Sequence, residues 1–152
     1  MPEFEVFRVK ASVTFALRRA VLGPRPNEPS LEDMARPDDD HPDSGHFAVY
    51  DEVGHVIGTG TVCSRQAPWS PDVAGYQIRG MAVEPEQRGR GIGAAVLGAI
   101  ISHVGTRGGG LLWCQVRTNA RTLYERAGFL LRGGPYMDES SGEQVIMYRQ
   151  VP

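Results

Sequence analysis

The order of hydrophobic and polar positions along the chain predicts an alternation of strands and helices. Apolar residues two apart predict strands, and apolar residues three or four apart predict helices. Val13, Ala16, Leu17 and Ala20 form the apolar stripe expected of the first helix. The expected elements are, in order, a strand over 4–10, a helix over 12–22, strands over 46–50, 55–64 and 76–83, a helix over 94–104, a strand over 111–116, a helix over 118–127, and strands over 129–137 and 144–151. This order predicts an α+β fold.

Two long segments lack this periodicity, and both are rich in proline. Residues 24–44 hold five prolines and the acidic run Asp38-Asp39-Asp40, with only a hint of a short helix around Met34. Residues 66–75 form a second Pro-rich loop. A connection as long as the first one is usually functional or disordered when it lies inside a compact domain.

The composition is that of an ordinary globular protein. The chain has 152 residues, 41% of them hydrophobic, and a net charge of −2, so we expect residues 1–152 to form a single domain. The slightly negative charge argues against nucleic acid as a partner. No apolar run reaches the roughly 18 residues of a membrane span, and the first five residues lack the basic start of a signal peptide. We therefore expect a cytoplasmic protein that does not bind membranes.

Residues with metal-binding or nucleophilic side chains are scattered along the sequence. The four histidines show no His-Glu-x-x-His spacing, and Cys63 and Cys114 each stand alone in an apolar, strand-like run. The Gly-x-Ser-x-Gly motif of serine hydrolases does not occur. The expectation is two buried, reduced thiols and no metal.

The segment with the clearest chemistry is the glycine-rich loop over 84–93, between a predicted strand and a predicted helix. Its three glycines, spaced by two, allow the backbone to approach a ligand closely. The first amide groups of the following helix have no partner within the helix, and such a helix start binds anions. Arg88 and Arg90 add positive charge beside it. The loop therefore predicts binding of a diphosphate of the kind found in nucleotide-like cofactors.

Three phosphate-loop patterns compete for this segment. The Walker pattern is absent, since no Gly-Lys-Ser or Gly-Lys-Thr follows the glycines. Gly89, Gly91 and Ala94 satisfy the dinucleotide fingerprint, but that pattern belongs early in a chain and needs an acidic residue about 20 positions on, which residues 109–116 do not supply. The third pattern, Arg/Gln-x-x-Gly-x-Gly/Ala, matches residues 88–93.

At this loop the chain resembles the GNAT superfamily of acyl-CoA-dependent N-acyltransferases. The strand over 77–83, followed by Glu84-Pro85-Glu86, resembles the family's central strand and the turn after it. Residues 120–129, which carry Tyr124 and end in Gly-Phe, resemble its second block. Together the two blocks cover about residues 75–130. The resemblance implies a three-layer α/β sandwich whose mixed, mostly antiparallel sheet splays apart beside the central strand.

The resemblance also implies acetyl-CoA (coenzyme A) as the cosubstrate, with its pantetheine arm in the splayed gap and no metal. Where many family members have an asparagine, this chain has Arg117, with Asn119 two residues later. Arg117 would bond a pantetheine carbonyl or a phosphate, or lie in solvent at the strand end. The residues expected to bind the cofactor are Met81, Ala82, Val83, Arg88, Gly89, Arg90, Gly91, Ile92, Gly93, Ala94, Arg117, Asn119 and Tyr124.

Tyr124 is also the predicted catalytic acid. Its phenol can donate a hydrogen bond or a proton to the departing thiolate, as the matching tyrosine is thought to do in the family. The alternative is a tyrosine packed on the sheet with its hydroxyl in water. Gly80 predicts a bulge in this strand or a close approach of a ligand. A bulge leaves amides unpaired, so a backbone N–H near Met81 or Ala82 is expected to stabilise the oxyanion.

The general base stays open between several groups. Glu84, at the end of the central strand, is the catalytic candidate, although Glu-Pro is also ordinary turn chemistry. His46 opens a strand near the substrate side, where a lone histidine is often structural. A water chain ending in a carboxylate is a third arrangement. Arg79 would either orient a carboxylate or phosphate of the acceptor or lie at the surface. The acidic run would either steer a cationic amine toward the cleft or be a solvated loop.

These residues predict an enzyme, an N-acetyltransferase that moves an acetyl group from acetyl-CoA to a primary amine by direct attack in a ternary complex. The sequence does not identify the acceptor, which would be a small molecule or a protein amine, and a homodimer is a frequent default. Two alternatives are a non-catalytic acyl-CoA-binding domain that has lost the acceptor chemistry, and a nucleotide-binding oxidoreductase based on the dinucleotide match.

Overall fold

The computed structural model describes residues 4–24, 27–139 and 141–152. The helices are α1 (Phe15–Leu22), α2 (Ile92–Thr106) and α3 (Arg121–Arg126), with 3₁₀ turns η1 (Ala11–Thr14), η2 (Glu32–Met34), η3 (Pro85–Gln87) and η4 (Thr118–Ala120). The strands are β1 (Phe7–Arg8), β2 (Gly45–Tyr50), β3 (Val56–Ser64), β4 (Gly75–Val83), β5 (Gly110–Arg117), β6 (Leu130–Asp138) and β7 (Gly142–Val151). Within these residues, no helix is long and apolar enough to cross a membrane.

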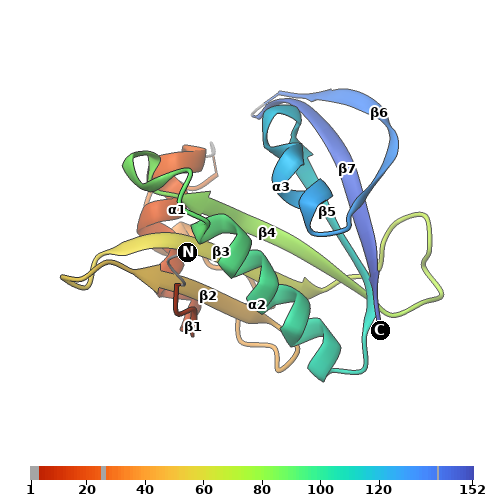
Figure 1. The fold of residues 1–152 in the computed structure, drawn as a ribbon, viewed down its shortest axis with the longest axis horizontal. Coiled ribbons are helices and arrows are strands. Elements are labelled where there is room, and N and C mark those ends of the chain that lie inside the picture. Colours follow the sequence, from red (N-terminus) through yellow and green to blue (C-terminus); the bar gives the residue numbers. More distant parts are fainter. Residues whose placement is uncertain (1–3, 25–26, 140) are drawn as a thin grey trace.

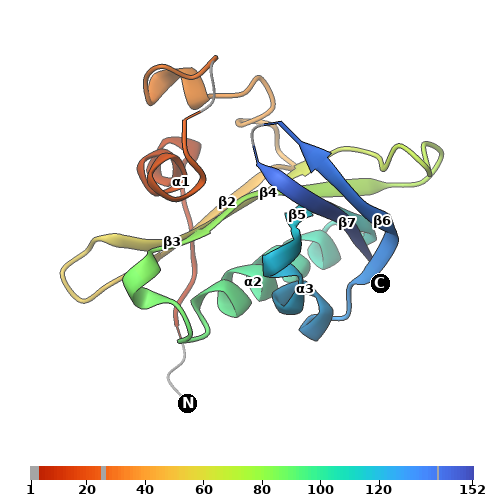
Figure 2. The ribbon, with the colours of Figure 1, turned by 90° about the horizontal axis from the view of Figure 1, so that it is seen from above.

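The strands form one mixed sheet in the order β1-β2-β3-β4-β5-β7-β6 (Figure 1). Every neighbouring pair is antiparallel except β4 and β5, which run parallel. The helix α1 lies on one side of the sheet, and α2 and α3 lie side by side on the other (Figure 2). The predicted three-layer arrangement around a mixed, mostly antiparallel sheet is therefore confirmed.

The core lies between α2 and the first half of the sheet. The buried side of α2 repeats every three or four residues, and two glycines of β3 allow the helix to come close. A side chain at Gly58 would collide with Ile92, and a Cβ at Gly60 would lie 2.6 Å from Cγ1 of Val96. The first turn of α2 therefore rests directly on the backbone of β3.

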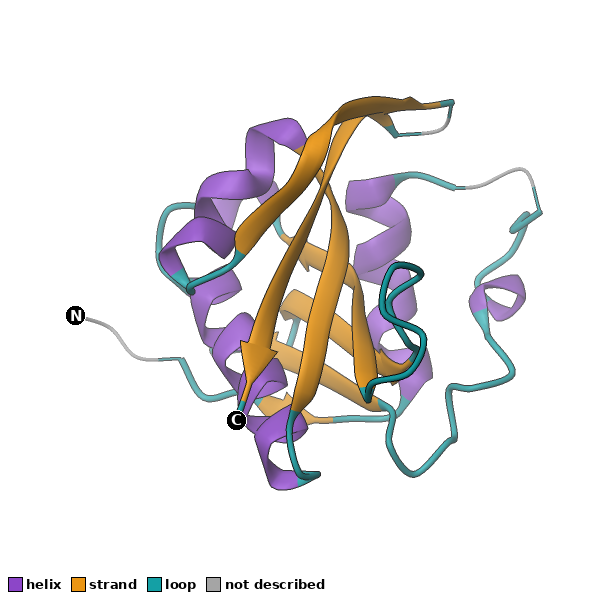
Figure 3. Cartoon of the chain, turned by 90° about the vertical axis from the view of Figure 1, so that its right-hand side faces the viewer, coloured by secondary structure: helices purple, strands orange, loops and turns teal. Residues whose placement is uncertain are grey.

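The strands β4 and β5 separate partway along their length. They pair from Gly75–Ile78 to Leu111–Cys114, and beyond these residues β4 pairs only with β3 and β5 only with β7. Figure 3 shows the sheet twisting strongly along these strands. This divergence is the gap predicted beside the central strand.

A bulge interrupts β4 next to this gap. Thr59 of β3 pairs with Ala82 and Thr61 pairs with Arg79, so that two residues of β4 stand opposite one of β3. Gly80 lies in the bulge with a φ of 67°, a conformation that favours glycine. The predicted bulge at Gly80 is confirmed.

The N-terminal elements differ from the sequence prediction in two respects. The strand predicted over 4–10 is reduced to two residues, because Phe4 and Val6 pack onto the core as irregular chain. In α1, Ala16 and Ala20 are exposed. The buried side of this helix and the turn before it is formed instead by Thr14, Phe15, Leu17 and Arg18.

The helix predicted over 118–127 also begins differently. A 3₁₀ turn, η4, precedes α3, and its cap position is Arg117. Thr118 starts the predicted helix, and a threonine at a helix start is predicted to cap it, but its buried Oγ1 makes no hydrogen bond with the described residues. The predicted cap is wrong because Thr118 lies inside the 3₁₀ turn instead of preceding a regular helix.

Candidate active site

A cleft of about 430 Å³ opens where β4 and β5 diverge. Its walls are formed by α1 and the connection after it, residues 77–81 of β4, residues 114–117 of β5, Tyr124 of α3, and Asp138 and Gln144 of the β6–β7 hairpin. Segments from both ends of the chain therefore meet at this gap.

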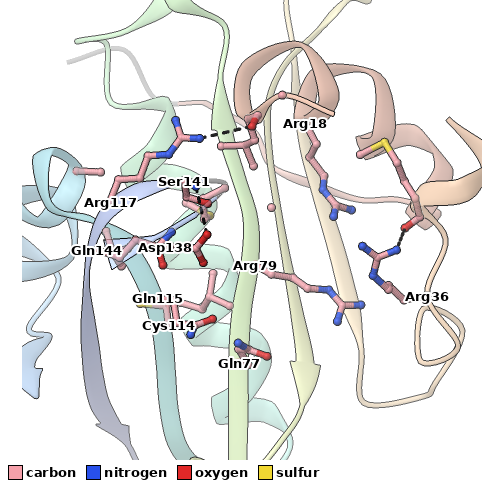
Figure 4. A pocket seen from close by; sticks show the side chains of 18 of the residues that line it. Arg18, Arg36, Gln77, Arg79, Cys114, Gln115, Arg117, Asp138, Ser141 and Gln144 are labelled. Carbon is pink, nitrogen blue, oxygen red and sulfur yellow. Dashed lines mark hydrogen bonds between the residues drawn. The ribbon is translucent and has the colours of Figure 1, made fainter. Parts of the chain in front are cut away.

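The two walls of the cleft carry different side chains. In Figure 4, Arg18, Arg36 and Arg79 lie on one side of β4, and Arg117 and Asp138 lie on the other side. The first wall comes from α1, the 24–44 connection and β4, whereas the second comes from β5 and the C-terminal hairpin. A ligand in the cleft would therefore contact guanidinium groups at one end, and a carboxylate beside a further guanidinium group at the other.

Tyr124 lies in the part of the cleft between the two walls. Its ring packs edge-on against Phe129, with 5.5 Å between the ring centroids. The described residues offer its hydroxyl no hydrogen-bond partner. Burial, followed by the nearby Cys114 thiol, raises the pKa of the Tyr124 phenol well above 10. The phenol therefore keeps its proton at neutral pH and can donate it to a ligand.

The glycine-rich loop has the open conformation expected of an anion-binding helix start. Gly89 and Gly91 have φ values of 79° and 88°, and a Cβ at either position would meet no atom within 4 Å. Gly91 is the cap residue of α2. Arg88 and Arg90 are exposed beside the loop, and Arg90 donates a hydrogen bond to the side chain of Gln87. The loop leaves space around its backbone.

The start of α2 lies next to the helix that carries Tyr124. A Cβ at Gly93 would lie 3.3 Å from Cδ2 of Leu123, which is the neighbour of Tyr124 in α3. The predicted diphosphate loop and the predicted catalytic tyrosine are therefore adjacent, on the side of the sheet covered by α2 and α3 (Figure 2).

The other residues expected to bind the cofactor are spread over several environments. Met81 lines the cleft, and Val83 is half-buried further along β4. Ala82 and Ile92 are buried, so their side chains belong to the core and only their backbone can face a ligand. Ala94 is exposed in the first turn of α2.

Arg117 and Asn119 share a smaller cavity beside the cleft, together with Ser141 and Glu143. Arg117 also lines the main cleft, and its Nη2 lies 3.4 Å from the carbonyl oxygen of Leu22, across the opening between β5 and α1. Arg117 is therefore the one of the two that borders the main cleft.

The candidates for the general base also lie apart. Glu84 is half-buried at the end of β4, where its N–H donates to Ile57, and it is not among the residues that line the cleft. His46 is buried, with Nδ1 3.0 Å from Oγ1 of Thr61 and Nε2 2.9 Å from the carbonyl oxygen of Asp39. Both of its ring nitrogens are occupied within the fold.

Arg79 binds the acidic run. Its Nη2 lies 2.8 Å from Oδ1 of Asp38 and 3.2 Å from Oδ1 of Asp39. Burial alone would raise the pKa of Asp38, but the hydrogen bond and the charge of Arg79 outweigh it and lower that pKa. Asp38 and Asp39 are therefore ion-paired within the fold instead of fully solvated. Asp40 is exposed.

Several residues of the cleft were not identified from the sequence. Gln77 and Gln115 are polar positions within otherwise apolar strands, and that contrast could have marked them. Asp138 has no such signal, and its Oδ1 accepts a hydrogen bond from the N–H of Ser141 in the hairpin turn. Arg18 has a weak signal, because Phe15, Val21 and Leu22, three or four positions away in the helix, are apolar.

A forked mixed sheet, with a glycine-rich helix start beside the fork, is the fold of the GNAT acetyltransferases. The model of the Acetyltransferase (GNAT) family matches residues 15–129. The chain therefore belongs to the acetyltransferase (GNAT) family.

Individual relatives agree with this assignment. The chain is 23% identical over 145 residues to "Uncharacterized N-acetyltransferase YitI" of Bacillus subtilis, covering 95% of each chain. It is similar to a phosphinothricin acetyltransferase from Sinorhizobium meliloti in complex with AcCoA, with a TM-score of 0.74, 20% identity, and coverage of 97% of this chain and 88% of the other. It is also similar to nourseothricin acetyltransferase, with a TM-score of 0.60, 31% identity, and coverage of 78% and 70%.

Proposed function

We propose that this protein transfers an acetyl group from acetyl-CoA to a primary amine by direct attack in a ternary complex. The observation that carries the proposal is the position of Tyr124 where β4 and β5 diverge, with a protonated phenol to which the described residues offer no hydrogen bond. The open loop before α2 lies beside the helix that bears this tyrosine. In acetyl-CoA the pantetheine arm joins the diphosphate to the thioester, so one molecule would place the diphosphate at the loop and the thioester between β4 and β5.

The loop would hold the diphosphate of acetyl-CoA. The free N–H groups at the start of the 15-residue helix α2 point along its axis, and the helix dipole favours negative charge there. Arg88 and Arg90 would add charge-assisted hydrogen bonds from the rim. The pantetheine arm would then run along the unpaired edge of β4 from Val83 toward Met81.

The reaction needs three groups around the thioester carbon. The acceptor nitrogen forms a bond to this carbon, and the carbonyl oxygen gains negative charge that a backbone N–H of the bulge near Met81 or Ala82 would stabilise. The C–S bond then breaks. Tyr124 would give its proton to the departing sulfur, and a base would take the proton released by the nitrogen.

Two carboxylates can be compared as the base. Glu84 lies outside the cleft lining, so it would act through a chain of water molecules. Asp138 lies in the lining, opposite Arg18 and Arg79 (Figure 4). The pH dependence of kcat/KM for Glu84→Gln and Asp138→Asn would assign the role. The variant that lacks the base should lose the acidic limb of the profile, because that limb reports ionisation of the base.

The size of the cleft favours a small acceptor over a protein amine. A volume of about 430 Å³ must hold the end of the pantetheine arm together with the acceptor. Phosphinothricin and nourseothricin, for which the similar structures are named, belong in an acceptor screen for this reason. A non-catalytic acyl-CoA-binding domain would bind acetyl-CoA but release no thiol with any amine.

The first experiment is calorimetric titration of the protein with acetyl-CoA, with NADH as the control ligand. In Gly91→Glu, a carboxylate would stand where the diphosphate is expected, and we expect the affinity to fall at least about tenfold. Gly108→Glu is the matched control, because Gly108 has a φ of 93°, open surroundings and a place beyond the other end of α2. Equal acetyl-CoA binding by both variants, or tighter binding of NADH, would contradict the proposal.

A further inference from the structure

Arg18 is the one arginine of the cleft wall to which the described residues give neither a hydrogen bond nor an ion pair. It is 9% exposed, and its Nε atom is fully enclosed. The ring of Phe15 lies 5.9 Å from its Cζ. A guanidinium group stays charged in proteins, and a buried charge without a partner is costly. This cost indicates that the partner of Arg18 is a ligand.

The neighbouring arginines have their own carboxylates. Arg36 forms an ion pair with Glu28, and Arg79 binds both Asp38 and Asp39. Each of these side chains is therefore ion-paired within the fold, although Nε of Arg79 has no hydrogen-bond partner among the described residues. Among the described residues on this wall, Arg18 is therefore the cation without a hydrogen bond or an ion pair.

The backbone of β4 is shaped to accept this side chain. A Cβ at Gly80 would lie 2.6 Å from Nε of Arg18, so the guanidinium packs against bare backbone at the bulge. The same bulge contributes Met81 to the cleft. An acceptor whose anion binds Arg18 would therefore lie beside the thioester carbonyl carbon, which the acceptor nitrogen attacks in the proposed reaction.

Resting on the proposed function, we propose that the acceptor amine carries an oxyanion group, a carboxylate or a phosphate, that binds Arg18. Guanidinium groups recognise both anions by paired hydrogen bonds. The amino group of such a molecule would then lie toward Asp138 and Gln144 on the opposite wall, which also carries Arg117 (Figure 4). Amino acids and amino phosphates have this pairing of charges.

The test compares matched acceptors that differ only in the anion. Amino acids are measured against their amides, and phosphoethanolamine against ethanolamine, by thiol release from acetyl-CoA. We expect the anionic member of at least one pair to have a kcat/KM about 10- to 100-fold higher. In Arg18→Met the KM for the anionic acceptor should rise until this preference disappears, while the affinity for acetyl-CoA stays unchanged. Arg126→Gln, which removes an exposed charge, is the control and should keep the preference.

Binding of the same amines is also measured by thermal shift without acetyl-CoA. Anion-dependent stabilisation of the wild type but not of Arg18→Met supports the inference even without thiol release, and in that case it is the proposed function that fails. Acetylation of neutral amines with equal or higher kcat/KM overturns the inference and leaves the proposed function intact. If no anionic amine is bound or acetylated, the inference is also overturned. Arg18→Met should fold normally, because a methionine there removes a buried charge.

Discussion

Asp38 and Arg79 are 41 positions apart in the sequence, and their side chains meet at a distance of 2.8 Å between Oδ1 and Nη2. This ion pair, together with Asp39, attaches the long Pro-rich connection to the central strand of the sheet. The connection lies on the same side of the sheet as α1 (Figures 2 and 3). A segment that looks like a loose loop in the sequence is thus a fixed part of the cleft wall.

Removing these carboxylates should destabilise the protein. In Asp38→Asn/Asp39→Asn, the half-buried Arg79 would lose both ionic partners, and we expect the free energy of unfolding to fall by about 1–2 kcal/mol. Because the folded-state pKa of Asp38 is lowered, its contribution is present above about pH 3.8 and is lost as the pH falls below that value. Urea unfolding at pH 7 and pH 3 measures both effects, and Asp40→Asn is the exposed control.

Tyr124→Phe should lose turnover without losing cofactor affinity. The ring and its contact with Phe129 remain, but the proton donor is absent, so we expect kcat to fall about 10²-fold with an unchanged Kd for acetyl-CoA. Because burial raises the pKa of Tyr124 above 10, ionisation of this residue should cause no loss of wild-type activity up to pH 10. Tyr50→Phe, outside the cleft lining and packed against Phe7, serves as control. An unchanged kcat in Tyr124→Phe would exclude the assigned role.

Gly80→Ala should be more damaging than another glycine substitution at a similar φ. Gly54 has a φ of 88° and open surroundings, so Gly54→Ala measures the backbone strain alone, about 1–2 kcal/mol. At Gly80 the methyl group also meets Arg18, which adds to the loss. A double-mutant cycle with Arg18→Ala should recover the added part, and strict additivity of the two changes would argue against the contact.

Stability should decline between pH 7 and pH 5 because of His103. Its Nε2 lies 2.8 Å from the carbonyl oxygen of Asp43, its ring packs edge-on against Phe47, and burial lowers its pKa below 6.5. The unfolded chain therefore binds a proton at higher pH than the native state, and the free energy of unfolding falls as the pH drops below about 6.5. His103→Gln should show a shallower decline by urea unfolding. His55→Gln, at an exposed position, should decline as the wild type does.

The parts of the fold that the sequence predicted well are governed by local patterns. The hairpin of β2 and β3, the central strand β4 and the helix α2 have the predicted types and nearly the predicted bounds, because periodicity and glycine-rich turns determine them. The gap beside β4 and the position of Tyr124 followed from two sequence motifs.

What could not be predicted depends on packing between distant segments. The alanines of α1 suggested one buried side, but the sheet buries the side that carries Phe15 and Arg18. Asp138 faces the arginines only because the C-terminal hairpin folds back beside β5. No local pattern records either relationship, and both determine the chemistry of the cleft wall.

The absence of a side chain at Gly58 determines how closely the start of α2 approaches β3. Ile92, the first residue of α2, rests against this glycine, and the amide groups expected to hold a diphosphate lie in the same turn. A single methyl group on β3 would push this turn outward and lengthen the span from the loop to Tyr124. The pantetheine chain has a limited length, so this distance must match it. The strand β3 makes no contact with the ligand in this arrangement, yet it sets the distance between the loop and Tyr124 to the length of the acyl donor.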